Sequence, residues 1–356
     1  MDEHPAHQRR DGDFRALMAR AVDVASTARF RARPNPWVGA VLVCADGSTF
    51  EGATAEPGGP HAEIAVLSAA RDAGADTAGA LLVCTLEPCN HTGRTGPCTE
   101  AIIAAGITAV VVAVTDPDHR VAGAGITRLR GAGIDVTTGV LADEVEEQLA
   151  PYLHHRSTGR PWVVVKMAMT LDSRTVAPGG KRWITGDAAR VRVHALRAES
   201  DVIVTGIGTV RADDPELTVR HVEGPSPRRI VMSRNGAVPA GAKVQPCETW
   251  TGTPGELLES LGADGVLQVM VEAGPGLVSA FHGAGLVNRW VLHVAPEVSG
   301  DLSAPGLFPR GTDDIHSLSN NRLVSASMLG DDLEIILEPT GNPSSDIPSS
   351  RRSTAA

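Results

Sequence analysis

The chain has 356 residues and a formal net charge of −10 at pH 7. This length favours two domains, and the acidic balance argues against nucleic acid or an anionic membrane as the main partner, but not against a small phosphorylated ligand. An odd count of five cysteines does not indicate a disulfide framework. No apolar run is long enough to span a membrane and the first residues do not resemble a signal peptide, so we expect a cytoplasmic, reduced protein.

Both ends of the chain are polar and without periodic pattern, and residues 1–12 and 341–356 are expected to be disordered. Between them, apolar β-branched runs alternate with helical patterns. In the first half, the expected strands are Val38–Cys44, Ala80–Thr85 and Thr108–Thr115. The expected helices of this half are His61–Ala73, Pro97–Ala105, Ala122–Arg130 and Glu144–His155.

A break at Ser157–Pro161 is the best linker candidate, and the alternation then restarts. The expected strands of the second half are Trp162–Met169, Asp201–Thr205, Arg229–Met232, Leu267–Val271, Arg289–Ala295 and Leu333–Leu337. The expected helices are Asp187–Glu199, Pro254–Leu261 and Pro275–Gly283. Alternation of this kind predicts two α/β domains, covering residues 13–155 and 160–340.

Three residues of the first half carry the strongest chemical signal. His61 opens a His-Ala-Glu motif, and Cys89 and Cys98 enclose a loop of eight residues. One imidazole and two thiolates make a zinc site with an open fourth position, where the metal lowers the pKa of a bound water towards about 7. Glu63 is suited to shuttle protons. This set predicts zinc-dependent deamination of a nucleobase-like ring.

The spacing also indicates where these residues lie. Positions i and i+2 of a helix are about 200° apart, so His61 and Glu63 are expected in the first turn of a helix that borders a cleft. Cys89 follows a strand, at the carboxyl edge where α/β ligand sites form. A structural zinc site without catalysis is the bland alternative, and Glu63 argues against it because such a site has no use for an unliganded carboxylate.

The second half shows weaker local signals. Thr205–Thr209 and Gly274–Gly276 are glycine turns after strands, which suit a phosphate cradle or are simply tight turns. Arg190 and Arg197 are seven positions apart on one expected helix and share a face, which either binds an anion or is solvated.

The order of motifs adds a family resemblance that spans nearly all of residues 14–340. One set of segments resembles the deaminase half of the bifunctional riboflavin-biosynthesis enzymes: Pro34–Val41, Pro60–Glu63, Thr85–Cys98 and Asp116–Asp118. A second set resembles the reductase half of the same family: Lys166–Arg174, Arg182–Gly186, Arg197–Glu199, Gly206–Val210, Ala212–Arg220, Val271–Leu277 and Ala284–Val287.

The resemblance implies a cytidine-deaminase-like three-layer sandwich followed by a dihydrofolate-reductase-like α/β domain. It implies zinc-dependent hydrolytic deamination of 2,5-diamino-6-(5-phosphoribosylamino)pyrimidin-4(3H)-one. The ribosyl group of the product would then be reduced to ribityl with NADPH. The implied partners are this small molecule and further copies of the chain in a homo-oligomer.

The resemblance also implies roles for individual residues. His61, Cys89 and Cys98 would hold zinc, Glu63 would be catalytic, and Asn35 would bind the pyrimidine, although alone it reads as a turn residue between prolines. The NADPH site would be lined by Met169, Trp183, Thr209, Asp213, Ser233, Gly274, Pro275, Gly276, Leu277, Val278, Ser279 and Ala280. The substrate of the reduction would contact Lys181, Arg197, Leu217, Arg220 and Glu272, and its proton donor would be Lys166 or Asp172.

Four positions depart from the family pattern. Thr54 stands in place of a histidine, Asn90 in place of a serine, Asp118 in place of an asparagine, and Ser173 in place of a glycine. These departures leave the metal ligands intact but admit a specialised relative that acts on a similar pyrimidine. A further alternative is a zinc deaminase whose second domain only binds a nucleotide or mediates oligomerisation. The complete motif set of the second half argues against it.

Overall fold

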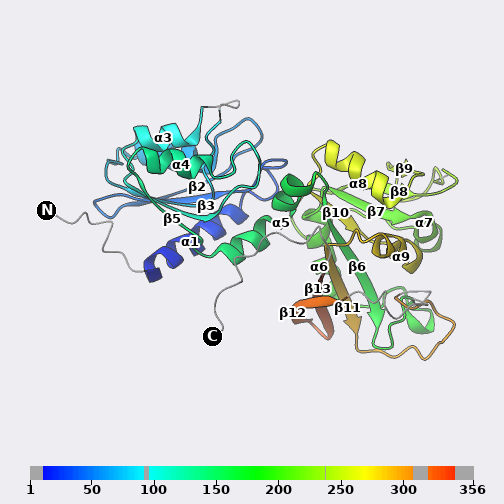
Figure 1. Ribbon diagram of the computed structural model, residues 1–356. Helices are drawn as coiled ribbons and strands as arrows, with labels where there is room; N and C mark the ends of the chain where they lie inside the picture. Colours follow the sequence, from blue (N-terminus) through cyan, green and yellow to red (C-terminus); the bar gives the residue numbers. More distant parts are fainter. Residues whose placement is uncertain (1–10, 92–95, 237, 308–319, 341–356) are drawn as a thin grey trace. The chain divides into compact units, whose positions relative to one another are not determined.

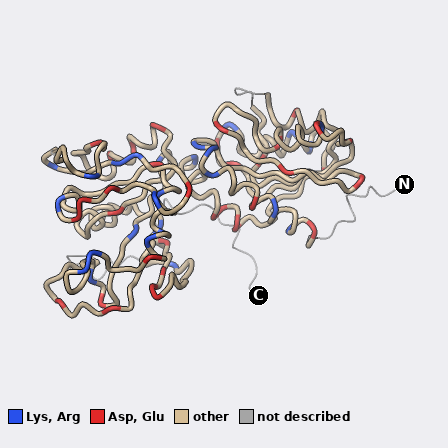
Figure 2. Tube along the Cα trace, turned by 180° about the vertical axis from the view of Figure 1, so that it is seen from behind, with Lys and Arg blue, Asp and Glu red and all other residues tan. Residues whose placement is uncertain are grey.

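The computed structural model describes residues 11–91, 96–236, 238–307 and 320–340. The chain divides into two compact units, Met1–Ser157 and Thr158–Ala356 (Figure 1). Lys and Arg alternate with Asp and Glu along both units (Figure 2). No helix within the described ranges is long and apolar enough to cross a membrane.

The first unit is built on a five-stranded sheet with the order β2-β1-β3-β4-β5. β1 pairs antiparallel with β2 and β3, whereas β3, β4 and β5 are parallel. Its elements are α1 (Asp11–Ser26), β1 (Gly39–Val43), β2 (Thr49–Ala53), α2 (Ala62–Asp72), β3 (Leu81–Leu86), α3 (Cys98–Ala104), β4 (Ala109–Val114), α4 (Ala124–Gly131), β5 (Asp135–Thr138) and α5 (Ala142–Thr158).

Helices cover both faces of this sheet and make the expected three-layer sandwich. α3 and α4 lie on one face and α1 and α5 on the other (Figure 1), and α2 packs on β1 and β2 beside α3. Every residue of β3 is buried, as are the first five of β4. Burial from both sides explains why these strands are continuous apolar runs.

The structure corrects the expectation for residues 1–12. Residues 11 and 12 belong to α1, while residues 1–10 and 341–356 lie outside the described residues. α1 buries Met18, Ala21 and Ala25 completely. This stripe follows the helical spacing, but alanine contributes little hydrophobic contrast, so the sequence pattern is weak. The short strands β2 and β5 were also missed, and both carry exposed polar residues.

The expected break at Ser157–Pro161 is shorter in the structure. α5 continues through Thr158, beyond the predicted helix end at His155. Gly159 follows with φ of +73°, a left-handed conformation that commonly ends helices and that glycine adopts without a steric penalty. Strand β6 then begins at Trp162.

The second unit has an eight-stranded sheet with the order β12-β13-β11-β6-β10-β7-β8-β9. The six strands from β11 to β9 are parallel, and β13 and β12 add an antiparallel edge. Its elements are β6 (Trp162–Thr170), a 3₁₀ turn (Pro178–Gly180), α6 (Asp187–Ala198), β7 (Val202–Gly206), α7 (Ile207–Asp213), β8 (Arg228–Met232), β9 (Glu248–Trp250), α8 (Pro254–Ala263), β10 (Gln268–Val271), α9 (Pro275–Gly283), β11 (Arg289–Ala295), β12 (Asn321–Leu329) and β13 (Asp332–Pro339).

The core of this unit lies between the parallel strands and two helices. Leu257 and Leu261 of α8 and Val278 and Phe281 of α9 join one buried apolar cluster with β6, β7 and β10. Gly206 and Gly274 each lie in a turn between a parallel strand and the following helix, at the carboxyl end of the strand. Open α/β sheets bind ligands at this edge. The β12–β13 hairpin completes the sheet with a largely exposed edge strand.

Candidate active sites

The structure brings the three predicted metal ligands of the first unit together. Nδ1 of His61 is 3.6 Å from Sγ of Cys89 and 3.4 Å from Sγ of Cys98. All three donor atoms lie within 4.8 Å of one another. A tetrahedral zinc with a Zn–N bond of about 2.0 Å and Zn–S bonds of about 2.3 Å needs N and S atoms about 3.6 Å apart. The donor set and its spacing therefore fit zinc.

Two helix starts position these donors. His61 is the extended N-cap residue of α2, and Glu63 lies in the first turn of that helix, as the spacing predicted. Cys98 is the first residue of α3, directly after Pro97, and its backbone N–H donates to Sγ of Cys89 over 3.5 Å. Hydrogen bonds from the Cys98 thiol, and secondarily from His61, lower the pKa of Cys89, which favours the thiolate that a metal requires.

Glu63 is buried beside these donors, with 4% of its surface exposed. Burial, together with the negative charge of the Cys89 thiolate, raises the pKa of Glu63 to about 7. A carboxyl group with a pKa near neutral both accepts and returns a proton efficiently, which is the property a general acid/base needs.

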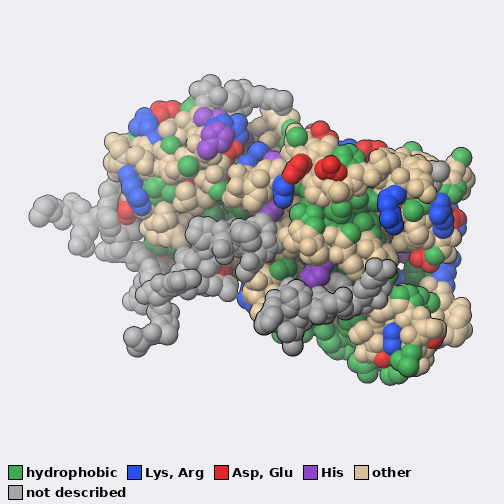
Figure 3. Space-filling model, turned by 45° about the vertical axis from the view of Figure 1, so that its right-hand side comes forward, with side chains coloured by type: hydrophobic (Ala, Val, Ile, Leu, Met, Phe, Trp, Pro, Cys, Tyr) green, Lys and Arg blue, Asp and Glu red, His purple; other side chains and the backbone are tan. Residues whose placement is uncertain are grey.

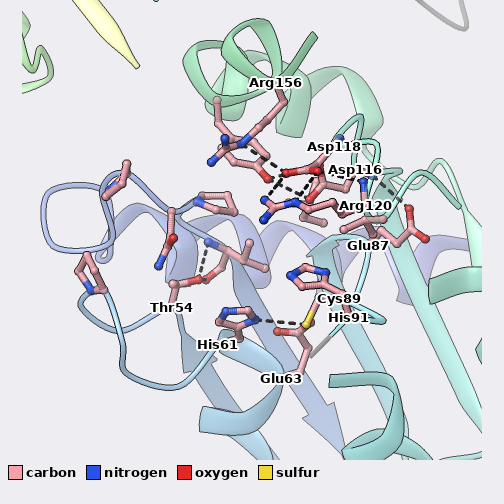
Figure 4. Close-up of a pocket in the computed structure, with 18 of the residues that line it drawn as sticks. Thr54, His61, Glu63, Glu87, Cys89, His91, Asp116, Asp118, Arg120 and Arg156 are labelled. Atoms are coloured by element: carbon pink, nitrogen blue, oxygen red, sulfur yellow. Dashed lines mark hydrogen bonds and ion pairs between the residues drawn. The ribbon is translucent and has the colours of Figure 1, made fainter. Parts of the chain in front are cut away.

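His61, Glu63 and Cys89 line a cavity of about 410 Å³ whose lining residues run from Pro34 to Arg156, all in the first unit (Figure 4). Cys98 is fully buried behind them. Asn35, between Pro34 and Pro36, lines the cavity as well. Thr54 is one of the positions that depart from the family pattern. Its hydroxyl accepts the backbone N–H of Val38 over 3.0 Å, so this side chain is bonded to the main chain of the cavity wall.

The sequence reasoning missed three acidic or phenolic groups that build the far wall. The Glu87 carboxylate is buried and accepts hydrogen bonds from four backbone N–H groups, those of Asp116, Gly123, Gly125 and Ile126. Asp116 in turn accepts the Tyr152 hydroxyl over 3.0 Å, and burial raises the pKa of Asp116. The signal that could have indicated Glu87 is its place in Glu87-Pro88-Cys89, directly after β3, because the carboxyl ends of strands form the ligand sites of α/β sheets.

In the second unit, Arg197 and Glu272 form a bidentate ion pair, with Nε–Oε2 and Nη2–Oε1 distances of 2.9 and 2.8 Å. Arg197 also donates to the carbonyl of Thr218 over 3.0 Å, and Nδ1 of His194 accepts the backbone N–H of Arg220 over 3.0 Å. Two side chains of α6 therefore hold the segment that carries Leu217 and Arg220.

Lys166 of β6 is buried close to this ion pair. Burial lowers the pKa of Lys166, and the Glu272 carboxylate opposes that shift. The other proton-donor candidate, Asp172, accepts bonds from the Thr170 hydroxyl and the backbone N–H groups of Ser299 and Gly300. These bonds lower the pKa of Asp172 to about 2, so it holds a loop and has no proton to give at neutral pH.

The predicted NADPH-lining residues stand at the carboxyl edge of the second sheet or next to it. Oγ1 of Thr209 accepts the backbone N–H of Gly274 over 3.0 Å, which joins the two glycine turns. Pro275–Ala280 form the start of α9, Asp213 ends α7, Ser233 follows β8, and Met169 is buried near the end of β6.

Two further predicted residues are more exposed. Trp183 has 51% of its surface exposed, and the guanidinium groups of Arg182 and Arg190 lie 5.1 and 5.4 Å from its ring centroid. Lys181 forms an exposed ion pair with Glu297 over 2.6 Å.

Comparison with known proteins links both units to one family. A sequence profile for the "cytidine and deoxycytidylate deaminase zinc-binding region" matches residues 13–114, and one for the "RibD C-terminal domain" matches residues 161–335. The riboflavin biosynthesis protein RibD of Mycobacterium tuberculosis is 42% identical over 279 residues, 75% of this chain and 80% of that protein.

Solved structures agree with this match over both units. The RibD structure from Acinetobacter baumannii, form 1, is 34% identical, with a TM-score of 0.85 over 93% of this chain and 100% of that one. A diaminohydroxyphosphoribosylaminopyrimidine deaminase/5-amino-6-(5-phosphoribosylamino)uracil reductase from Thermotoga maritima is 30% identical, with a TM-score of 0.84 over 92% of this chain and 99% of that one.

Proposed function

Because this chain belongs to the RibD family of riboflavin-biosynthesis proteins, we propose that its two units catalyse successive steps on one phosphoribosylaminopyrimidine. The family is a zinc-dependent deaminase and an NADPH-dependent reductase in a single chain. We assign the deaminase to residues 13–155 and the reductase to residues 160–340. The observation that carries the proposal is the converging donor set of the first unit with a buried glutamate beside it.

In the deaminase, His61, Cys89 and Cys98 would hold Zn²⁺, which when bound supplies a Lewis acid that activates water. Water adds to the ring carbon that carries the exocyclic amine, and ammonia leaves. Glu63 would accept a proton from the attacking water and deliver it to the departing amine, a role that suits a buried carboxyl group whose pKa is raised by burial. Asn35, on the cavity wall, would orient the pyrimidine.

In the reductase, NADPH when bound supplies a hydride to C1′ of the ribosyl group. The cofactor would rest on Met169, Trp183, Thr209, Asp213, Ser233 and Gly274–Ala280. The phosphoribosylamino group would contact Lys181, Arg197, Leu217, Arg220 and Glu272.

The reduction also consumes one proton. Lys166 is the candidate donor, because burial lowers its pKa and so makes the ammonium a better acid. Its interaction with the charge of Glu272, one of the proposed substrate contacts, supports this assignment.

Replacement of Glu63 tests the first step. Glu63→Gln should abolish ammonia release and leave bound zinc unchanged, because the carboxylate is not a ligand. The same variant should oxidise NADPH normally when supplied with the deaminated pyrimidine. Ammonia release at the wild-type rate would refute the role of Glu63.

A matched replacement tests the second step. Lys166→Met should stop NADPH oxidation and leave ammonia release intact. Absence of NADPH oxidation by the wild-type protein with authentic deaminated pyrimidine would refute the reductase assignment.

We also infer that the chain forms a homo-oligomer in the cytoplasm. β12 is an edge strand on which Leu323 and Met328 are 58% and 63% exposed, and such edges favour pairing with another chain. Apolar side chains also gather on the face of the second unit shown in Figure 3. A reducing cytoplasm suits thiol ligands that must remain free. Sedimentation of wild-type protein and of Leu323→Glu measures the assembly.

A further inference from the structure

Two arginines face the deaminase cavity at the end away from the metal ligands. Arg120 and Arg156 line the cavity together with Asp118, and His61, Cys89 and Glu63 are grouped at the other end (Figure 4). The proposed substrate has the same polarity, with an amine-bearing ring at one end and a phosphate at the other. The cavity thus offers cations where the second end of such a molecule would lie.

Asp118 anchors the Arg120 guanidinium by one edge. Nε of Arg120 donates to Oδ1 over 3.0 Å and Nη2 donates to Oδ2 over 2.6 Å. The backbone N–H of Arg120 also donates to Oδ1 over 3.0 Å. A guanidinium has five N–H donors, so this anchoring leaves the Nη1/Nη2 edge with its hydrogens directed away from Asp118. That edge has the spacing that binds two oxygens of a phosphate.

The anchoring also lowers the entropic cost of binding. The Arg120 side chain is 54% exposed, yet two bonds to a buried carboxylate restrict its rotamers before any ligand arrives. A side chain that is held in its binding geometry loses little freedom on complex formation. An asparagine at position 118, as in the family pattern, has one acceptor oxygen and no charge, and would not hold the guanidinium in this way.

A second arginine shares the Asp118 carboxylate. Nε of Arg156 lies 3.7 Å from Oδ2 of the same Asp118, and its guanidinium packs 5.1 Å from the Tyr152 ring centroid. Two cations therefore surround one carboxylate, and the group carries one net positive charge at the cavity wall. Three further acids line the cavity, Glu63, Glu87 and Asp116. Glu63 lies at the metal end, the Glu87 oxygens accept four backbone N–H groups and Asp116 accepts the Tyr152 hydroxyl, so these acids have partners of their own and the outer edge of the Arg120 guanidinium faces away from its carboxylate.

We propose that Arg120, anchored by Asp118 and supported by Arg156, binds the phosphate of the pyrimidine substrate in the deaminase cavity and determines specificity for the phosphorylated form. This proposal rests on the proposed deaminase function. Asp118 acts here through Arg120, as the residue that positions its guanidinium.

The test compares two substrates and three proteins. Ammonia release is measured with the phosphorylated pyrimidine and with its dephosphorylated counterpart, for wild type, Arg120→Gln and Arg20→Gln. Arg20 is the matched control, since it makes a similar Nε/Nη2 pair with Glu51 and is comparably exposed, but does not line the cavity. Arg120→Gln should raise KM for the phosphorylated substrate about tenfold or more, the loss expected for a charge-assisted phosphate contact.

Further measurements separate loss of phosphate binding from a general loss of activity. The KM for the dephosphorylated substrate and the kcat for both should stay within about threefold of wild type, which also shows that the variant is folded. Asp118→Asn keeps the cation but removes its anchor, and should give a smaller rise in KM that is again confined to the phosphorylated substrate. Equal effects of Arg120→Gln on both substrates, or no effect on either, would overturn the proposal. No ammonia release by the wild type would instead refute the deaminase function.

Discussion

Replacement of Glu87 by glutamine tests whether a buried carboxylate builds the wall of the deaminase cavity. Its Oε1 accepts the N–H groups of Gly125 and Ile126 over 2.9 and 3.1 Å, and its Oε2 those of Gly123 and Asp116 over 3.0 and 3.2 Å. Glutamine keeps one of these oxygens and presents an NH₂ group to the other two donors. Two charge-assisted bonds are lost and two buried N–H groups face a donor.

Each lost bond is worth about 1.5–3 kcal/mol. The wild-type carboxylate pays a desolvation cost that the neutral amide avoids, and this offsets part of the loss. We therefore expect Glu87→Gln to lower the free energy of unfolding of the first unit by about 3 kcal/mol. The displaced N–H groups begin α4, so the loop that carries the Asp118–Arg120 pair should loosen and KM for ammonia release should rise.

The assay is urea unfolding followed by hydrogen exchange of peptides from the first unit. Peptides of the second unit, and NADPH oxidation with the deaminated pyrimidine, should be unchanged and serve as internal references. Glu51→Gln is the matched control, because exposed ion pairs such as its pair with Arg20 contribute less than about 1 kcal/mol. A loss below about 1 kcal/mol for Glu87→Gln would refute the reasoning.

Three other changes have defined outcomes. Ser173 has φ of +62°, so Ser173→Gly should stabilise the second unit by about 0.5 kcal/mol, seen as a higher Tm, and an unchanged or lower Tm would contradict this. Burial, with the charges of Arg197 and His221, lowers the pKa of His194 to about 4, so folding favours its neutral form. The stability from this form is complete above pH 6.5 and is lost as the pH falls from 6.5 towards 4. His194→Asn keeps an acceptor for the Arg220 N–H and should reduce the difference in urea midpoint between pH 7 and pH 5. An unaltered difference would be evidence against this role of His194. Chelation of the metal should stop ammonia release, leave NADPH oxidation intact and be reversed by Zn²⁺, whereas ammonia release that survives complete metal removal would exclude a catalytic metal.

Much of the fold follows from local patterns. The bounds of α9 and β11 agree with those expected from the sequence, because proline at a helix start and a β-branched run between turns are strong local signals. The edge strands β2, β5 and β12 were not expected. β2 and β5 are short and only partly buried, and β12 is exposed at seven of its nine positions. They form strands because a neighbouring strand supplies hydrogen-bond partners.

By itself the sequence determined the chemistry of the first site: a histidine and a glutamate at one helix start, and two cysteines around a loop. These residue types bind zinc and move protons wherever they converge. Only the tertiary structure decided that they do converge, since His61 is 28 and 37 positions from the two cysteines. It likewise decided where Glu87 and Arg120 lie. A carboxylate that accepts N–H groups 29 to 39 positions away depends on backbone positions that the packing of sheet and helices creates, and no local pattern encodes them. The Asp118–Arg120 pair is local, but only the tertiary structure places it on the wall of the cavity.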